Sequence, residues 1–110
     1  MEETDLNSIS LSEEGQLTVD VFQTEQDVVI QSTVAGATSE NIDISLAKDV
    51  VTIKGHRHNT EPISNVAYDH RELHWGPFSR SIILPVEVDV EKAKAVIKNG
   101  LLTIKLPKLV

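Results

Sequence analysis

The sequence predicts an all-β fold, an antiparallel β-sandwich or barrel, and three observations support this. Apolar residues alternate with polar residues at a period of two, rather than the 3.6 of a helix, along most of the chain. These runs are short and rich in β-branched residues, which suit a pleated, half-buried surface. Turn residues separate them at a spacing of roughly 8–12 residues, as in sandwiches and barrels. The only hints of helical turns, at 39–41 and 90–93, are too short to stand alone.

The expected strands follow one another along the whole chain after its first residues. They are 17–21, 28–34, 42–46, 51–53, 81–84, 93–97 and 102–106. The expected turns between them are 24–27, 35–37, 48–49, 76–77, 85 and 99–100. Asn99-Gly100 is the most specific of these, because Asn-Gly favours a two-residue hairpin turn. Residues 56–68 form an unusually long connection, which predicts a functional loop or one that contains a further strand.

Length and composition indicate one soluble domain. The chain has 110 residues, of which 40% are hydrophobic and 25% charged. No run approaches the roughly 18 apolar residues of a membrane span, and the acidic N-terminus lacks the apolar stretch of a secretory signal. The sequence contains no cysteine, which excludes disulfides, thiolate catalysis and zinc–thiolate sites. We therefore expect a cytoplasmic protein.

The charge is acidic overall and uneven. The net charge is −7, and residues 1–55 hold 11 acidic and 2 basic side chains, against 6 and 8 in residues 56–110. A net-acidic chain without a concentrated basic stripe is a poor nucleic-acid binder, because neutralised phosphates supply most of that affinity. The acidic half is interpreted as a solvated surface that favours solubility. The alternative is that the two halves help to align two subunits.

Four groups of residues between 17 and 108 suggest a family. They are 19–24; 51–55; 72–80 with 83–85; and 95–102 with 106–107. Each is weak alone, but together and in this order they resemble the alpha-crystallin domain of small heat-shock proteins, of the bacterial and plant type. The resemblance implies an immunoglobulin-like antiparallel β-sandwich. It also implies an ATP-independent holdase, which binds partly unfolded proteins and prevents their aggregation.

The resemblance also divides the chain. It implies a flexible N-terminal tail at 1–14, the alpha-crystallin domain at 15–108 and a C-terminal stub at 109–110. The family's L-P-G turn is Val34-Ala35-Gly36 here, without the proline, and Gly36 still supplies the flexible φ of the turn. Family members usually begin with a longer hydrophobic arm and continue into an I-x-I/V motif. We therefore expect either an excised domain or a naturally short member.

Assembly is the first role that the resemblance implies. In the family, a strand within the long loop pairs with the first domain strand of a second subunit, which here places 66–72 against 17–21. Arg80, at the family's F-x-R position, suits a partly buried ion pair near that interface. The predicted dimer interface is Leu17, Val19, Val21, Tyr68, Asp69, His70, Arg71, Glu72 and Arg80. The alternatives are a surface hairpin within one subunit and a solvent-facing Arg80.

The second implied site is a groove that binds clients or the I-x-I tail of another chain. Its expected walls come from the strands 42–46 and 93–97, where small alanines leave room for an incoming branched side chain. The groove residues are Ile42, Ile44, Leu46, Ala93, Ala95 and Ile97. The alternative is that these residues are ordinary core.

No constellation in the sequence predicts catalysis. His56 and His58 would share a face of a strand, with His70 and His74 as further ligands, but exposed loop histidines are the favoured interpretation. Asp89 and Glu91 lack the aromatic platform of a glycosidase, and no serine-nucleophile or phosphate-loop motif occurs.

The prediction is therefore a non-enzyme without cofactor or metal, whose partners are non-native proteins and a second copy of itself. It has no nucleic-acid or membrane partner. The alternative is a CS-type adaptor domain that binds a partner chaperone instead of clients. The segment 75–78 is interpreted as a turn with aromatic packing.

Overall fold

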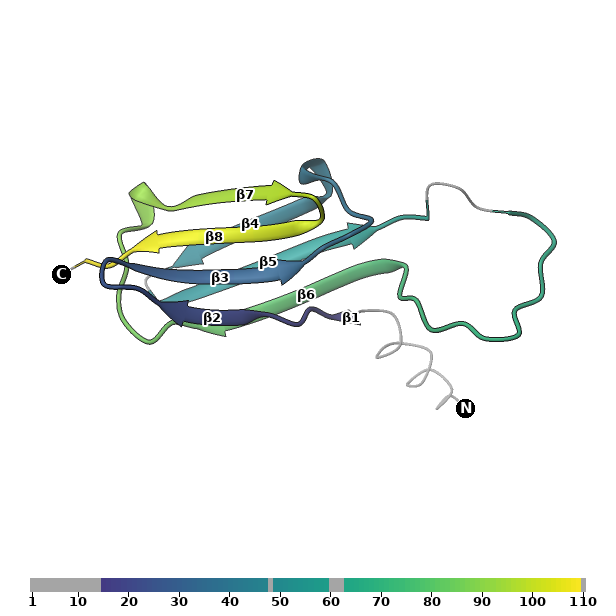
Figure 1. Ribbon diagram of the computed structural model, residues 1–110, viewed down its shortest axis with the longest axis horizontal. Coiled ribbons are helices and arrows are strands. Elements are labelled where there is room, and N and C mark those ends of the chain that lie inside the picture. Colours follow the sequence, from purple (N-terminus) through teal and green to yellow (C-terminus); the bar gives the residue numbers. More distant parts are fainter. Residues whose placement is uncertain (1–14, 48, 60–62, 110) are drawn as a thin grey trace, which may run out of the picture.

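The molecule is a sandwich of two four-stranded sheets (Figure 1). The structure, a computed structural model, describes residues 15–47, 49–59 and 63–109. One sheet has the strand order β1-β6-β5-β4 and the other β2-β3-β8-β7. The strands are β1 (Gly15–Gln16), β2 (Asp20–Gln23), β3 (Asp27–Thr33), β4 (Ile42–Ala47), β5 (Val50–Arg57), β6 (Gly76–Ile83), β7 (Lys94–Lys98) and β8 (Leu101–Pro107). The predicted all-β sandwich is confirmed.

Helix is limited to short 3₁₀ turns in the described residues. These are η2 (Ser39–Asn41) and η3 (Val90–Lys92), at the two places where the sequence hinted at helical turns. No helix of the described residues is long and apolar enough to cross a membrane. The predicted tail at 1–14 and the last residue of the predicted stub lie outside the described residues.

The core lies between the sheets and is filled by alternate residues of the central strands. Ile30 on β3 lies opposite Ile104 on β8, and both are buried. Ile53 on β5 faces them from the other sheet as part of the same cluster. Full burial of such a side chain stabilises the fold by about 1.5–3 kcal/mol. The period of two in the sequence is thus the period with which these strands bury one face.

The tight turns form where the sequence predicts them. Asn99 and Gly100 have φ values of 54° and 78°, the double positive φ of a two-residue hairpin turn, and they join β7 to β8. Gly36, with a φ of 89°, supplies the backbone conformation expected for the turn after β3. The β2–β3 turn closes through Thr24, whose N–H donates to Asp27 O at 2.8 Å.

The predicted strand 17–21 is wrong in its bounds, because the chain changes sheets there. The parallel pairing of β1 with β6 ends at Gln16, and the antiparallel pairing of β2 with β3 begins at Asp20. Between them, the Leu17 N–H donates to Ser79 O at 3.3 Å in one sheet. The Ser32 hydroxyl of the other sheet donates to Thr18 O at 2.7 Å. Residues 17–19 therefore bridge the two sheets.

The predicted turn at 76–77 is also wrong. Gly76 begins β6, and Pro77 lies opposite His56 on β5. A proline without an N–H donor is tolerated near the start of a strand, and Gly76 takes the φ of +117° that the chain needs to enter it. Phe78, 2% exposed, belongs to the core and not to a surface turn.

The long connection is real but begins later than predicted. β5 continues through His56 to Arg57, so the loop comprises residues 58–75. It projects beyond one end of the sandwich (Figure 1). Its described residues 58–59 and 63–75 form no strand within the chain. The predicted pairing of 66–72 requires a second copy and stays a prediction.

Candidate functional site

The outer strands of both sheets offer unpaired backbone to a partner. In the described residues β4 and β7 pair on one side only, and so does β2. β4 and β7 run along the same side of the sandwich and β2 along the other (Figure 1). Because an edge strand has free N–H and C=O groups along its length, each of these sides can accept an added strand.

We call the first of these sides the β4–β7 edge, defined by the six predicted groove residues. On β4, Ile42, Ile44 and Leu46 are partly buried and pack against the core. Ala93, before β7, and Ile97, on it, pack against the same core. The structure therefore brings five of the six predicted residues to one apolar core, from both sheets. That this edge is a peptide-binding groove stays a prediction.

Ala95 is the residue of this edge that combines an inward position with exposure. It lies opposite Ile104, which is 1% exposed and points into the core. Residues directly opposite each other in a sheet share a face, so the Ala95 methyl group is on the interior side. Ala95 is nevertheless exposed. Its neighbour Val96 is 58% exposed and faces the outside, which makes the pair a natural test and control.

The β2 side holds the first part of the predicted dimer interface. Leu17 is 5% exposed and belongs to the chain's own core, so its side chain is not presented at the surface. Val19 is partly buried against that core, whereas Val21 on β2 is 39% exposed. Within one chain, only Val21 of these three offers substantial apolar surface to a partner.

Arg80 has a partner within the chain. Its Nη1 donates to Leu17 O at 2.8 Å. This charge-assisted bond ties the segment that bridges the two sheets to β6, and it is a role that the sequence did not reveal. The predicted interface role of Arg80 stays a prediction, because a single chain does not test it.

The second part of the predicted interface lies in the loop and is exposed throughout. Tyr68 is 56% exposed, and the guanidinium carbon of Arg71 lies 4.7 Å from its ring centroid. Asp69, His70 and Glu72 are exposed beside them. These loop residues are therefore not buried against β2 of their own chain.

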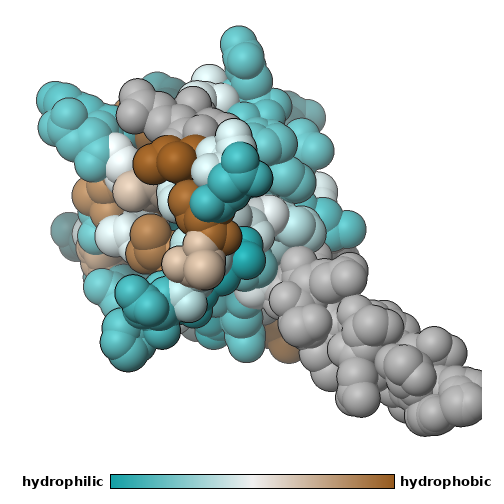
Figure 2. All heavy atoms as spheres, turned by 90° about the vertical axis from the view of Figure 1, so that its right-hand side faces the viewer, coloured by the Kyte–Doolittle hydropathy of each residue, from teal (hydrophilic) through white to brown (hydrophobic). Residues whose placement is uncertain are grey.

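Two further apolar residues of the loop, which were not predicted as site residues, are exposed. Ile63 is 76% exposed and Leu73 is 70% exposed. Apolar (brown) spheres gather at this end of the molecule, surrounded by hydrophilic ones (Figure 2). The signal available in the sequence was isolated large apolar residues within a polar connection. Exposed apolar patches that are surrounded by polar residues commonly mark interaction sites, so this end of the molecule is a candidate for one.

The candidate catalytic groups have structural partners. Asp89 Oδ1 accepts a hydrogen bond from the Glu91 N–H at 3.1 Å, as the N-cap of η3. His74 Nε2 lies 2.7 Å from Pro77 O. In the described residues no group of three or more His, Cys, Asp or Glu side chains lies together. The Asp89 carboxylate therefore caps η3, and Glu91 takes part in this bond through its backbone N–H.

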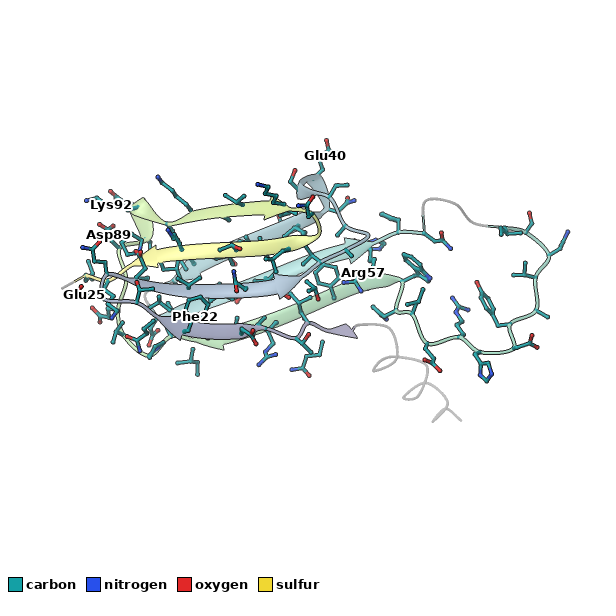
Figure 3. The ribbon with its side chains drawn as sticks, viewed as in Figure 1. Phe22, Glu25, Glu40, Arg57, Asp89 and Lys92 are labelled. Atoms are coloured by element: carbon teal, nitrogen blue, oxygen red, sulfur yellow. The ribbon has the colours of Figure 1, made fainter. Side chains whose placement is uncertain are left out.

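An arginine side chain packs against an aromatic ring where the loop leaves the sandwich. The Arg57 guanidinium lies 5.2 Å from the Phe78 ring centroid, at the end of the sandwich where the loop departs (Figure 3). Phe78 in turn covers Gly55, where a Cβ atom would lie 2.5 Å from Phe78 Cζ. The loop thus leaves the sandwich from a closely packed base.

Comparison with known proteins identifies one family. The family model described as Hsp20/alpha crystallin family matches residues 20–110. The chain is 35% identical over 89 residues to "Small heat shock protein C4" of Rickettsia felis, covering 81% of this chain and 55% of that protein. It is 29% identical over 93 residues to "Heat shock protein 16" of Schizosaccharomyces pombe, covering 83% and 65%. The chain thus spans little more than half the length of the Rickettsia protein.

Solved structures show the same fold. Heat shock protein 16.0 from Schizosaccharomyces pombe aligns with a TM-score of 0.76 and 28% identity, over 86% of this chain and 87% of that one. The hspA structure from Xanthomonas axonopodis aligns with a TM-score of 0.75 and 24% identity, over 86% and 94%. Nothing in these matches points to an adaptor of the CS type.

Proposed function

Because the chain belongs to the Hsp20/alpha crystallin family, we propose that it is an ATP-independent holdase that captures partly unfolded proteins and keeps them soluble. The family consists of such chaperones and not of enzymes. The observation that carries the proposal for this chain is the β4–β7 edge, where unpaired backbone runs beside partly exposed apolar side chains.

Capture at this edge follows from the physics of strand addition. An extended client segment gains backbone hydrogen bonds along β4 or β7, while its alternate side chains contact the apolar residues there. Ala95 is small and exposed, so a larger client side chain could pack over it. The apolar tail of another family member would compete for the same space. Clients with excess exposed apolar area would therefore bind, and folded proteins would not.

The acidic surface would keep the captured client in solution. A net charge of −7 on 110 residues makes complexes repel one another and so opposes their association. We also place this activity in the cytoplasm, in keeping with the cysteine-free sequence.

Light scattering of a heated client, without ATP, tests the proposal. The protein should suppress aggregation at a few-fold molar excess. Ala95→Arg should abolish most of the suppression, because a long charged side chain would occupy the apolar surface of the β4–β7 edge. Val96→Arg, one residue away and facing outward, should suppress as well as the unchanged protein.

Loss in both variants, or in neither, would contradict capture at the β4–β7 edge. A protein that suppresses nothing would contradict the holdase proposal itself. Binding of a partner chaperone by that inactive protein would then favour the adaptor alternative.

We further propose that two chains exchange their loops, so that residues 66–72 of each pair with the β2 side of the other. Three features support it: the unpaired edge of β2, the exposed Val21 upon it, and a loop whose apolar residues Tyr68 and Leu73 are exposed in the single chain. Pairing would cover these residues. A dimer in sedimentation equilibrium at micromolar concentration supports the proposal, and a monomer at that concentration contradicts it.

A further inference from the structure

Two histidine rings touch at the point where β5 ends and the loop begins. The ring centroids of His56 and His58 are 4.1 Å apart, with the planes tilted by 37°. Residues two apart along an extended chain point to the same side. Arg57, between them, points inward over Phe78, so the two imidazoles share the outer face of the β1-β6-β5-β4 sheet.

One of these rings has an unsatisfied nitrogen. His56 Nδ1 is buried and has no hydrogen-bond partner. Buried polar atoms are almost always paired, and an exception commonly marks the place of a water molecule or an ion. The imidazole of His58 lies against this ring and is exposed, so an ion that arrives from solvent would meet the two rings together.

We propose that His56 and His58 form a two-imidazole binding site for a late divalent transition metal such as Cu²⁺. Neutral imidazole nitrogens are preferred donors for Cu²⁺, Ni²⁺ and Zn²⁺. The described residues contain no cluster of three or more ligands, so water would complete the coordination. A closed structural zinc site needs four protein ligands and does not fit. With no cysteine in the sequence, thiolates offer no competing site.

Charged residues lie near the two histidines, and a metal ion bound there would restrain the loop. Lys54 precedes His56 on the same face of β5, and it lies opposite Asp43 on β4. Its positive charge therefore has a carboxylate neighbour across the strand pair. A metal bound by both rings would join His58, the first loop residue, to the end of β5, and would restrain the direction in which the loop leaves the sandwich.

Titration of the protein with Cu²⁺, followed by Trp75 fluorescence, tests the site. Trp75 is the only tryptophan, and its ring approaches Gly36 beside the Arg57 side chain. Bound Cu²⁺ at the two histidines should therefore quench it. We expect saturable quenching by one ion per chain. His56→Asn and His58→Asn should each weaken the apparent affinity at least about tenfold.

His70→Asn serves as the matched control, because His70 is an exposed loop histidine without a described role in the pair. It should leave the affinity unchanged. His58 is exposed, so His58→Asn should keep the far-ultraviolet circular dichroism of the unchanged protein, and a loss of binding cannot then be attributed to misfolding. The proposal is overturned if His58→Asn titrates like the unchanged protein, if His70→Asn removes the site, or if quenching does not saturate.

Discussion

The sandwich buries large apolar residues in its core, whereas the loop exposes some of its own. In the sandwich, Ile30 and Ile53 are completely buried between two sheets, while in the loop Ile63 and Leu73 are more than two-thirds exposed. The sandwich buries these apolar side chains within a single chain. The loop has similar residues but no layer of its own chain to cover them. The difference predicts that substitutions in the core of the sandwich lower the free energy of unfolding more than substitutions of the exposed loop residues.

The edges of the sandwich fall between these extremes. Along β4 and β7 the apolar side chains are partly buried, in contact with the core and still open to solvent. A substitution there would change both packing and recognition. Substitutions in the core or in the loop separate the effect on packing from the effect on recognition more cleanly, so they provide the sharper experiments.

The largest effect is expected in the core. Ile53→Ala should lower the free energy of unfolding by about 2–5 kcal/mol, because it removes buried methyl groups and leaves a cavity. Ile63→Ala in the loop, where the side chain is 76% exposed, should change it by less than about 0.5 kcal/mol. Urea unfolding measures both, and equal losses would remove the contrast between the regions.

Overpacking at the base of the loop should come second. Gly55→Ala places a Cβ atom 2.5 Å from Phe78 Cζ and 2.9 Å from Asn41 O, so the structure must shift to relieve both contacts. The expected loss is about 1–3 kcal/mol. Phe78→Leu in the same chain should recover part of it, and a double-mutant cycle measures the coupling. Purely additive losses would show that the ring is not the obstacle.

The bond between Arg80 and the bridging segment should contribute less. Arg80→Met removes the donor to Leu17 O and should cost about 1 kcal/mol in the free energy of unfolding. Arg71→Met changes an arginine whose guanidinium lies against the exposed ring of Tyr68 in the loop, and it should cost nothing measurable by the same urea titration. A neutral Arg80→Met would mean that the bond does not stabilise the segment.

The smallest effect on folding is expected for the loop, although its effect on assembly should be large. Tyr68→Ser and Leu73→Ser should leave the free energy of unfolding of the single chain within about 0.5 kcal/mol. If the loops are exchanged between chains, the same variants should raise the dimer dissociation constant in sedimentation equilibrium. Unchanged dimerisation in both would contradict the exchanged loop.

The strands and the core could be predicted from the sequence because their signal is local. A strand that buries one face alternates residue by residue, so Leu102, Ile104 and Leu106 reveal the buried face of β8 without knowledge of the other strands. The hairpin turn at Asn99-Gly100 was predictable for a similar reason, since the positive φ values depend on the two residues themselves.

Part of the candidate site could be predicted in the same way, but its exposure could not. The alternation of Ile42, Ile44 and Leu46 identified one face of β4, and the structure confirms that this face packs against the core. Whether that face also meets solvent depends on β4 being an outer strand of its sheet. Strand order is a property of the whole fold, and it is not contained in any one segment.

What the sequence determined by itself is thus the set of strands, their buried faces and most turns between them, since these depend on neighbours along the chain. Only the tertiary structure decided where contacts form between distant segments. It made residues 17–19 a bridge between the sheets, turned Gly76 and Pro77 into the start of β6, and gave Arg80 the carbonyl of Leu17 as its partner. The physical reason is that these choices follow from which strands pair, and strand pairing is settled by burial over the whole molecule.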